Sequence, residues 1–147
     1  MNLTYWLQQQ LSGNDVPLDL PPNQQDLHGL TLIEAIEAHN AWIKKLDDLL
    51  HGKNPEEYDP AILGADHLCK VGKWLYGDGQ SLSKHPEFEK LRTEHKKFHD
   101  TAGEILNLRA DKKFAKALDL VRNDLPEASK KVKISLVSLM IAYHGEQ

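Results

Sequence analysis

The sequence predicts an all-α fold, an antiparallel four-helix bundle with an additional short helix or arm at the amino-terminal end. Two observations favour this fold class. Apolar residues recur at alternating steps of three and four along several long segments, which is the periodicity of amphipathic helices. No segment alternates apolar and polar residues between turn signals, as a half-buried strand would.

Length and composition indicate one globular domain. The chain has 147 residues, of which 40% are hydrophobic and 27% charged, and a chain of this size can bury a core without disulfides. The formal net charge of −4 argues against general binding to nucleic acids, whose phosphates require a basic face. Neither a membrane-spanning apolar run nor an export signal is visible, so we expect a cytoplasmic protein that does not insert into membranes.

Residues 1–29 differ from the rest and are predicted to be an arm or linker before a bundle of residues 30–147. A short amphipathic helix is expected before Gly13, with these apolar residues at helical spacing: Leu3, Trp6, Leu7 and Leu11. Residues 14–29 contain three prolines and are expected to be extended. The arm could pack on the bundle or dock another protein.

The first long helix is predicted to begin after Thr31, with Glu34 completing a capping box, and to end at Gly52. Its apolar stripe is interrupted by one histidine: Leu32, Ile36, His39, Ile43, Leu46 and Leu50. Asn54-Pro55 and Asp59-Pro60 mark the next loop. A second, continuous helix is expected over residues 60–76, with this inward stripe: Ile62, Ala65, Cys69, Gly72 and Tyr76.

A third helix is expected to open at Pro86 and to carry this stripe, with His99 and Leu106 beside it: Phe88, Leu91, His95, Phe98, Ala102 and Ile105. A fourth segment over residues 111–121 is expected to break around residues 123–126, although it could continue into the last helix. That helix is expected to run towards Tyr143 and to bury these residues: Ala128, Val132, Leu136 and Leu139.

Four metal-competent side chains lie on the inward stripes of three predicted helices: His39, Cys69, His95 and His99. His95 and His99 are four residues apart, so their rings lie one turn apart on one helix face. A single inward histidine is usually a hydrogen-bonded core residue, and a lone cysteine is often a small buried hydrophobe. Three buried imidazoles and a thiol are harder to satisfy by packing alone, and they suit one zinc ion, although copper(I) would also accept them.

The remaining histidines are expected to be solvated: His28, His51, His67, His85 and His144. His67 lies two residues before Cys69 and therefore points to another face of the second helix. Trp42 and Trp74 are expected to line the site.

At these positions the sequence resembles the chemoreceptor zinc-binding (CZB) domain family. Three motifs carry the resemblance: H-x-x-W from His39 to Trp42, C-x-V-G-K-W-L from Cys69 to Leu75, and H-x-x-F-H from His95 to His99. Their order and spacing also agree, and the similarity extends from about Leu30 to Leu139. The resemblance implies that His39, Cys69, His95 and His99 bind one zinc ion per chain.

The resemblance also implies a regulatory module that responds to zinc or to oxidants such as hypochlorous acid. Family members usually form dimers and are attached to chemoreceptors or diguanylate cyclases. The resemblance therefore implies a homodimer. No receptor or cyclase sequence is visible in these 147 residues, so we expect a stand-alone member that reaches a signalling partner in trans. A site with four protein ligands leaves no open position for water, so we do not expect an enzyme.

Two alternatives stay open at this stage. A hemerythrin-like di-iron oxygen carrier is suggested by the histidine pair in a helical bundle, but two irons need more inward histidines and bridging carboxylates than the stripes offer. A metal-free helical adaptor with a buried thiol is the second alternative.

Overall fold

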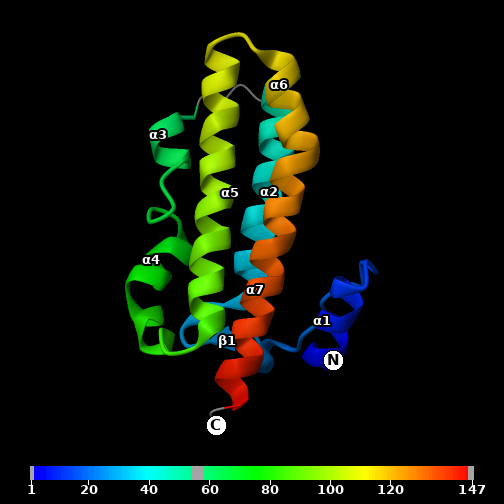
Figure 1. Cartoon of the computed structure of the whole chain (residues 1–147), viewed down its shortest axis with the longest axis vertical. Helices are drawn as coiled ribbons and strands as arrows, with labels where there is room; N and C mark the ends of the chain where they lie inside the picture. Colours follow the sequence, from blue (N-terminus) through cyan, green and yellow to red (C-terminus); the bar gives the residue numbers. More distant parts are fainter. Residues whose placement is uncertain (1, 54–57, 146–147) are drawn as a thin grey trace.

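Three long helices form the body of the computed structural model, which describes residues 2–53 and 58–145 (Figure 1). They are α2 (Leu32–Leu50), α5 (Pro86–Ala110) and α7 (Leu125–Gly145), and the most extensive helix pairing is that of α5 with α7. The predicted all-α, bundle-like fold is confirmed. The predicted turn at Asn54-Pro55 lies outside the described residues.

The core lies between the apolar stripes that the sequence predicts for these helices. Leu46 of α2, Leu91 and Phe98 of α5, and Leu136 and Leu139 of α7 are fully buried. Burying side chains of this size contributes roughly 1.5–3 kcal/mol each. Among the described residues, no helix combines the length and the apolar character needed to cross a membrane.

The segment between α2 and α5 is not the single helix predicted over residues 60–76, and that prediction is wrong. It forms two short helices, α3 (Pro60–Leu63) and α4 (Lys70–Tyr76), followed by the 3-10 helix η2 (Asp78–Leu82). The predicted stripe is wrong as well, because Ile62 is 59% and Tyr76 is 49% exposed. Gly72 is buried as predicted, but the other buried residues lie outside the predicted stripe: Leu63, Val71, Trp74 and Leu75.

The break between α3 and α4 has a steric reason at Gly72. A Cβ atom at this position would lie 1.8 Å from the carbonyl oxygen of Asp66, because the connecting segment folds back against the start of α4. Only a residue without a side chain allows that approach. The two short helices lie beside α5 in Figure 1.

The amino-terminal arm packs on the bundle, one of the two arrangements that the sequence allows. Helix α1 (Leu3–Leu11) is capped by the Asn2 side chain and contacts α7 (Figure 1). Trp6 is fully buried, and its Nε1 donates a hydrogen bond of 2.8 Å to the carbonyl of Val16.

The stretch predicted to be an extended linker contains a 3-10 turn, η1 (Pro22–Gln24), and a small antiparallel hairpin of β1 (Asp26–Leu27) and β2 (Leu30–Thr31). His28 and Gly29 form its two-residue turn with φ values of 47° and 94°. Positive φ at both central residues matches the right-handed twist of the strands, so the turn closes the hairpin. Asn and Asp are more usual than His at the first of these positions, so the sequence signal is weak.

The start of α2 agrees with the prediction but its cap does not, and the junction before α7 follows the alternative of a continuing helix. Thr31 is the residue before α2, but its side chain makes no capping bond; the Leu32 N–H instead donates to the carbonyl of Gln25 at 2.8 Å. Helix α6 (Phe114–Asp119) continues into α7 through a π-helical turn, η3 (Leu120–Asp124), so no break occurs before Pro126. The wider turn accommodates a proline that has no N–H to donate.

Candidate metal centre

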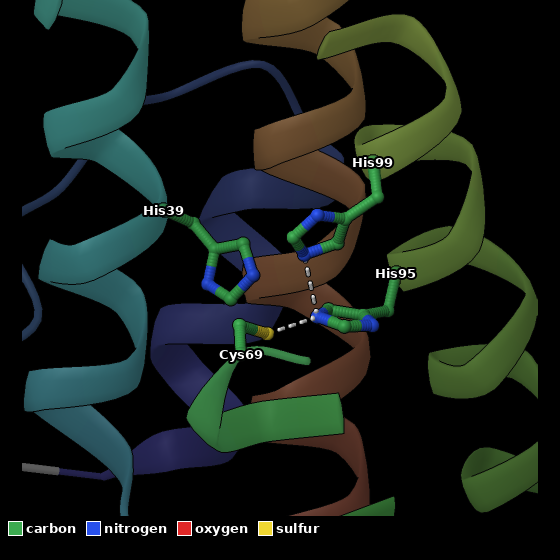
Figure 2. Close-up of side chains that lie close together, drawn as sticks. All are labelled: His39, Cys69, His95 and His99. Carbon is green, nitrogen blue, oxygen red and sulfur yellow. Dashed lines mark hydrogen bonds between the residues drawn. The ribbon is translucent and has the colours of Figure 1, made fainter. Parts of the chain in front are cut away.

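The structure brings the four predicted side chains to one point in the interior (Figure 2). His39 comes from α2, His95 and His99 come from successive turns of α5, and Cys69 is the N-cap residue of α4. One ligand atom from each residue lies within 4.8 Å of the others. Within the described residues, this is the one group of at least three His, Cys, Asp or Glu side chains that could hold a metal ion.

The separations between these atoms fit a single small ion. Cys69 Sγ lies 3.1 Å from His95 Nε2, which lies 3.2 Å from His99 Nε2. Neighbouring ligand atoms in a tetrahedral zinc site lie about 3.3–3.6 Å apart, given Zn–N distances of ~2.0–2.1 Å and Zn–S distances of ~2.3 Å. The four side chains are therefore arranged closely enough to share one ion.

Backbone carbonyls fix which nitrogen of two histidines faces the site. His39 Nδ1 donates to the carbonyl of Ala35 and His99 Nδ1 to that of Leu63, both at 2.8 Å. Because a carbonyl only accepts, each Nδ1 carries the hydrogen and each Nε2 presents its lone pair. Such bonds commonly orient metal-ligating histidines.

Two buried ring nitrogens lack a hydrogen-bond partner among the described residues, His39 Nε2 and His95 Nδ1. His39 Nε2 belongs to the four-residue group, and a bound metal ion would satisfy it. Leaving such a group unpaired in the interior costs roughly 1–3 kcal/mol. A metal ion at the centre would leave His95 Nδ1 unsatisfied, because the Nε2 of that ring is the nitrogen next to Cys69 and His99.

Burial keeps all four groups uncharged in the absence of a cation. Burial is the main reason, with a smaller effect of the neighbouring histidines, that the pKa of His39 is lowered to about 4 and that of His95 to about 2. Burial also lowers the pKa of His99 and raises that of the Cys69 thiol. Neutral imidazoles are ready to bind a metal, whereas the thiol has to lose its proton to do so.

The conformation of Cys69 depends on Gly72, the residue of α4 that allows the preceding segment to fold back against this helix. As the N-cap residue, Cys69 has φ −82° and ψ 169°, and its sulfur accepts a hydrogen bond of 3.4 Å from the Gly72 N–H. The sequence places Cys69 at the site but in the wrong local structure, since it precedes α4 instead of lying within a helix.

A cleft of about 810 Å³ leads to the site between α2 and α4. Its wall includes three of the four candidate ligands, His39, Cys69 and His99. Trp42 and Trp74 also line it, as the sequence predicts. Cys69 is half-buried and lines this cleft, so small solutes can approach its sulfur.

The other histidines lie outside the group. His67 is exposed, as expected, and its ring faces Tyr76. His28 is exposed but not merely solvated, because its Nε2 lies 2.9 Å from Ser81 Oγ and its carbonyl accepts a hydrogen bond from Trp74 Nε1. The two carbonyls that orient His39 and His99 were missed by sequence reasoning, since any residue type can supply a carbonyl.

Residues 39–106 match the family model of the chemoreceptor zinc-binding domain, a match that contains all four side chains and ends within α5. Residues 39–106 are therefore similar to this zinc-binding domain. No curated protein and no solved structure matches the chain. The CZB domain is a zinc-binding regulatory domain, and the three histidines and one cysteine can hold one zinc ion.

Proposed function

We propose that this protein is a zinc-binding regulatory module in which His39, Cys69, His95 and His99 bind one zinc ion, and in which Cys69 makes the module responsive to zinc and oxidants. One observation carries the proposal. The buried Nε2 of His39 has no hydrogen-bond partner, although the three atoms that the other residues offer as metal ligands lie within 4.8 Å of it. A cation at the centre of this group would satisfy it.

The donor set favours zinc over the di-iron alternative. Three imidazoles and a thiol form a borderline-soft set that suits zinc, whereas di-iron carriers use bridging carboxylates. The group contains no carboxylate among the described residues. The buried Glu94 precedes His95 but is not part of the group.

The proposed response is centred on the Cys69 sulfur. When bound, zinc keeps this sulfur as a thiolate and links α2, α5 and the start of α4. The thiolate reacts with hypochlorous acid to give a sulfenic acid and chloride, or with hydrogen peroxide to give a sulfenic acid and hydroxide. Cys69 is the only cysteine of the chain, so the sulfenic acid cannot form an intrachain disulfide.

Loss of the thiolate would change the packing around the site. Without it, His95 Nε2 loses its sulfur partner and His39 Nε2 stays unpaired, which favours a displacement of α4. We propose that this displacement is the signal.

The proposal extends to location and partners. We place the protein in the cytoplasm, where reducing conditions keep a single thiol available. Its partners would be a second copy of the chain and a signalling protein of a chemoreceptor or diguanylate cyclase pathway, as the family resemblance implies. We propose a regulatory rather than a catalytic role, because all four donors are used as ligands.

Zinc retention of matched variants tests the site. Purified protein should contain one zinc per chain by elemental analysis. Cys69→Ala should lower zinc affinity by at least ~100-fold, because a structural zinc site is worth roughly 10–16 kcal/mol shared among four ligands. His67→Ala is the control and should bind as the wild type does. Equal losses in both variants, or two irons per chain, would contradict the proposal.

The oxidant response is tested on the same zinc-loaded protein. One equivalent of hypochlorite should release zinc to a chromogenic chelator and leave a sulfenic acid at Cys69 that dimedone traps. Zinc release without modification of Cys69 would contradict the proposed role of this residue.

A further inference from the structure

The three histidines of the site are not oriented in the same way. His39 bonds to the carbonyl of Ala35, one turn earlier on its own helix. His99 bonds to the carbonyl of Leu63, which belongs to α3 and is 36 residues away in the sequence. The orientation of the His99 ring therefore depends on how α3 is docked on α5.

Gly103 limits how closely α5 and the end of α3 approach, and it lies against a second glycine, Gly64. A Cβ atom at Gly103 of α5 would lie 3.0 Å from Gly64 Cα and 3.2 Å from the carbonyl oxygen of Pro60. A Cβ atom at Gly64 would lie 3.5 Å from Gly103 Cα, an ordinary van der Waals contact, and 2.9 Å from the Pro60 oxygen of its own helix. All of these neighbours are backbone atoms of α3, of its C-cap residue or of α5, and they cannot rotate away as a side chain can.

Gly103 is an unfavourable residue for its own helix. It lies in the interior of α5, where glycine costs about 1 kcal/mol relative to alanine. The contact with Gly64 gives a physical reason for glycine here. It allows the backbone that follows Leu63 to lie directly on the turn of α5 that carries His99.

We propose that the Gly64–Gly103 contact positions His99 for zinc through the Leu63 carbonyl, and thereby couples the docking of α3 to zinc affinity. This inference rests on the proposed zinc site. A side chain at position 103 lifts α3 from α5 and lengthens the 2.8 Å bond that orients His99. Because coupling is reciprocal, zinc in turn favours the docked position of α3.

The first experiment measures zinc affinity by chelator competition in Gly103→Ala. We expect affinity to fall about tenfold, the lower end of the effect of losing such an orienting bond. Helix content should not fall, because alanine is the better helix former. Gly64→Ala approaches the contact from the other side and should weaken zinc binding as well. Gly145→Ala is the matched control, since no atom lies within 4 Å of a Cβ there, and its affinity should be unchanged.

A double-mutant cycle separates positioning from general destabilisation. If Gly103 acts through His99, Gly103→Ala should have no further effect on zinc affinity in a His99→Ala background. Hydrogen exchange gives a second readout: zinc should slow exchange of the α3 amides in the wild type and much less in Gly103→Ala.

Wild-type affinity in Gly103→Ala, or effects that add fully in the double variant, would overturn the coupling while leaving the zinc site intact. A wild-type protein that takes up no zinc would overturn both.

Discussion

The zinc-free protein should lose stability between pH 7 and pH 5, because it buries neutral histidines. The unfolded chain protonates each histidine near pH 6.5, whereas burial lowers the pKa of His39 to about 4 and that of His95 to about 2. Between these values the unfolded state binds more protons than the folded state does. The free energy of unfolding therefore falls as the pH falls below 6.5.

The loss of unfolding free energy can be calculated at pH 5, the lower end of the pH range. At pH 5 each of these two histidines favours the unfolded state by about 1.4 kcal/mol per pH unit below 6.5, or about 2 kcal/mol. His39 and His95 together give about 4 kcal/mol, and the lowered pKa of His99 adds to the loss with the same sign. Small domains are stable by only ~5–15 kcal/mol, so the effect is easily measured.

Urea unfolding of chelator-treated protein at pH 7, 6 and 5 provides the assay. The range stops at pH 5 because carboxylates begin to titrate below it. His39→Leu removes one buried titrating group and should reduce the loss by about 2 kcal/mol. His67→Ala alters an exposed histidine and should leave the loss unchanged. Equal stability of the zinc-free wild type at pH 7 and pH 5 would refute the burial argument.

Two further predictions concern the site and its surroundings. Zinc binding at pH 7 should release one proton, from Cys69, because the three histidines are already neutral. Calorimetry in two buffers of different ionisation enthalpy counts the released protons. A count of three would contradict the prediction. Trp74→Phe removes the 3.0 Å hydrogen bond to the His28 carbonyl and should lower the free energy of unfolding by about 1 kcal/mol, as measured by urea denaturation. An unchanged free energy of unfolding would mean that this bond does not stabilise the fold.

The long helices and the four candidate metal ligands could be predicted from the sequence because both depend on particular residue types at particular positions. Apolar residues at helical spacing predict α2, α5 and α7, which bury the stripes that face one another. His39 stands out because it interrupts an otherwise aliphatic stripe. His95 and His99 stand out because they share one face of one helix.

The features that could not be predicted depend on backbone atoms. The split between α3 and α4 arises because the Asp66 carbonyl occupies the space beside Gly72, and a glycine in a helical pattern gives no sign of such an approach. The Leu63 carbonyl that orients His99 could belong to any residue type. The hairpin turn at His28-Gly29 lacks the usual Asn or Asp, so its left-handed histidine was not anticipated.

The split of the second helix bears directly on how the site could signal. The three histidines lie on α2 and α5, whose 19 and 25 residues are anchored along the core. Cys69, the donor that we propose to be oxidised, precedes the seven-residue α4, which buries Val71, Trp74 and Leu75 but packs mainly against the neighbouring η2. Elements with few buried contacts open at lower free energy than the core does. Under the proposed function, a change at the Cys69 sulfur therefore acts on a short helix that packs little on the long ones, and α2 and α5 can keep the three imidazoles in place for zinc to rebind.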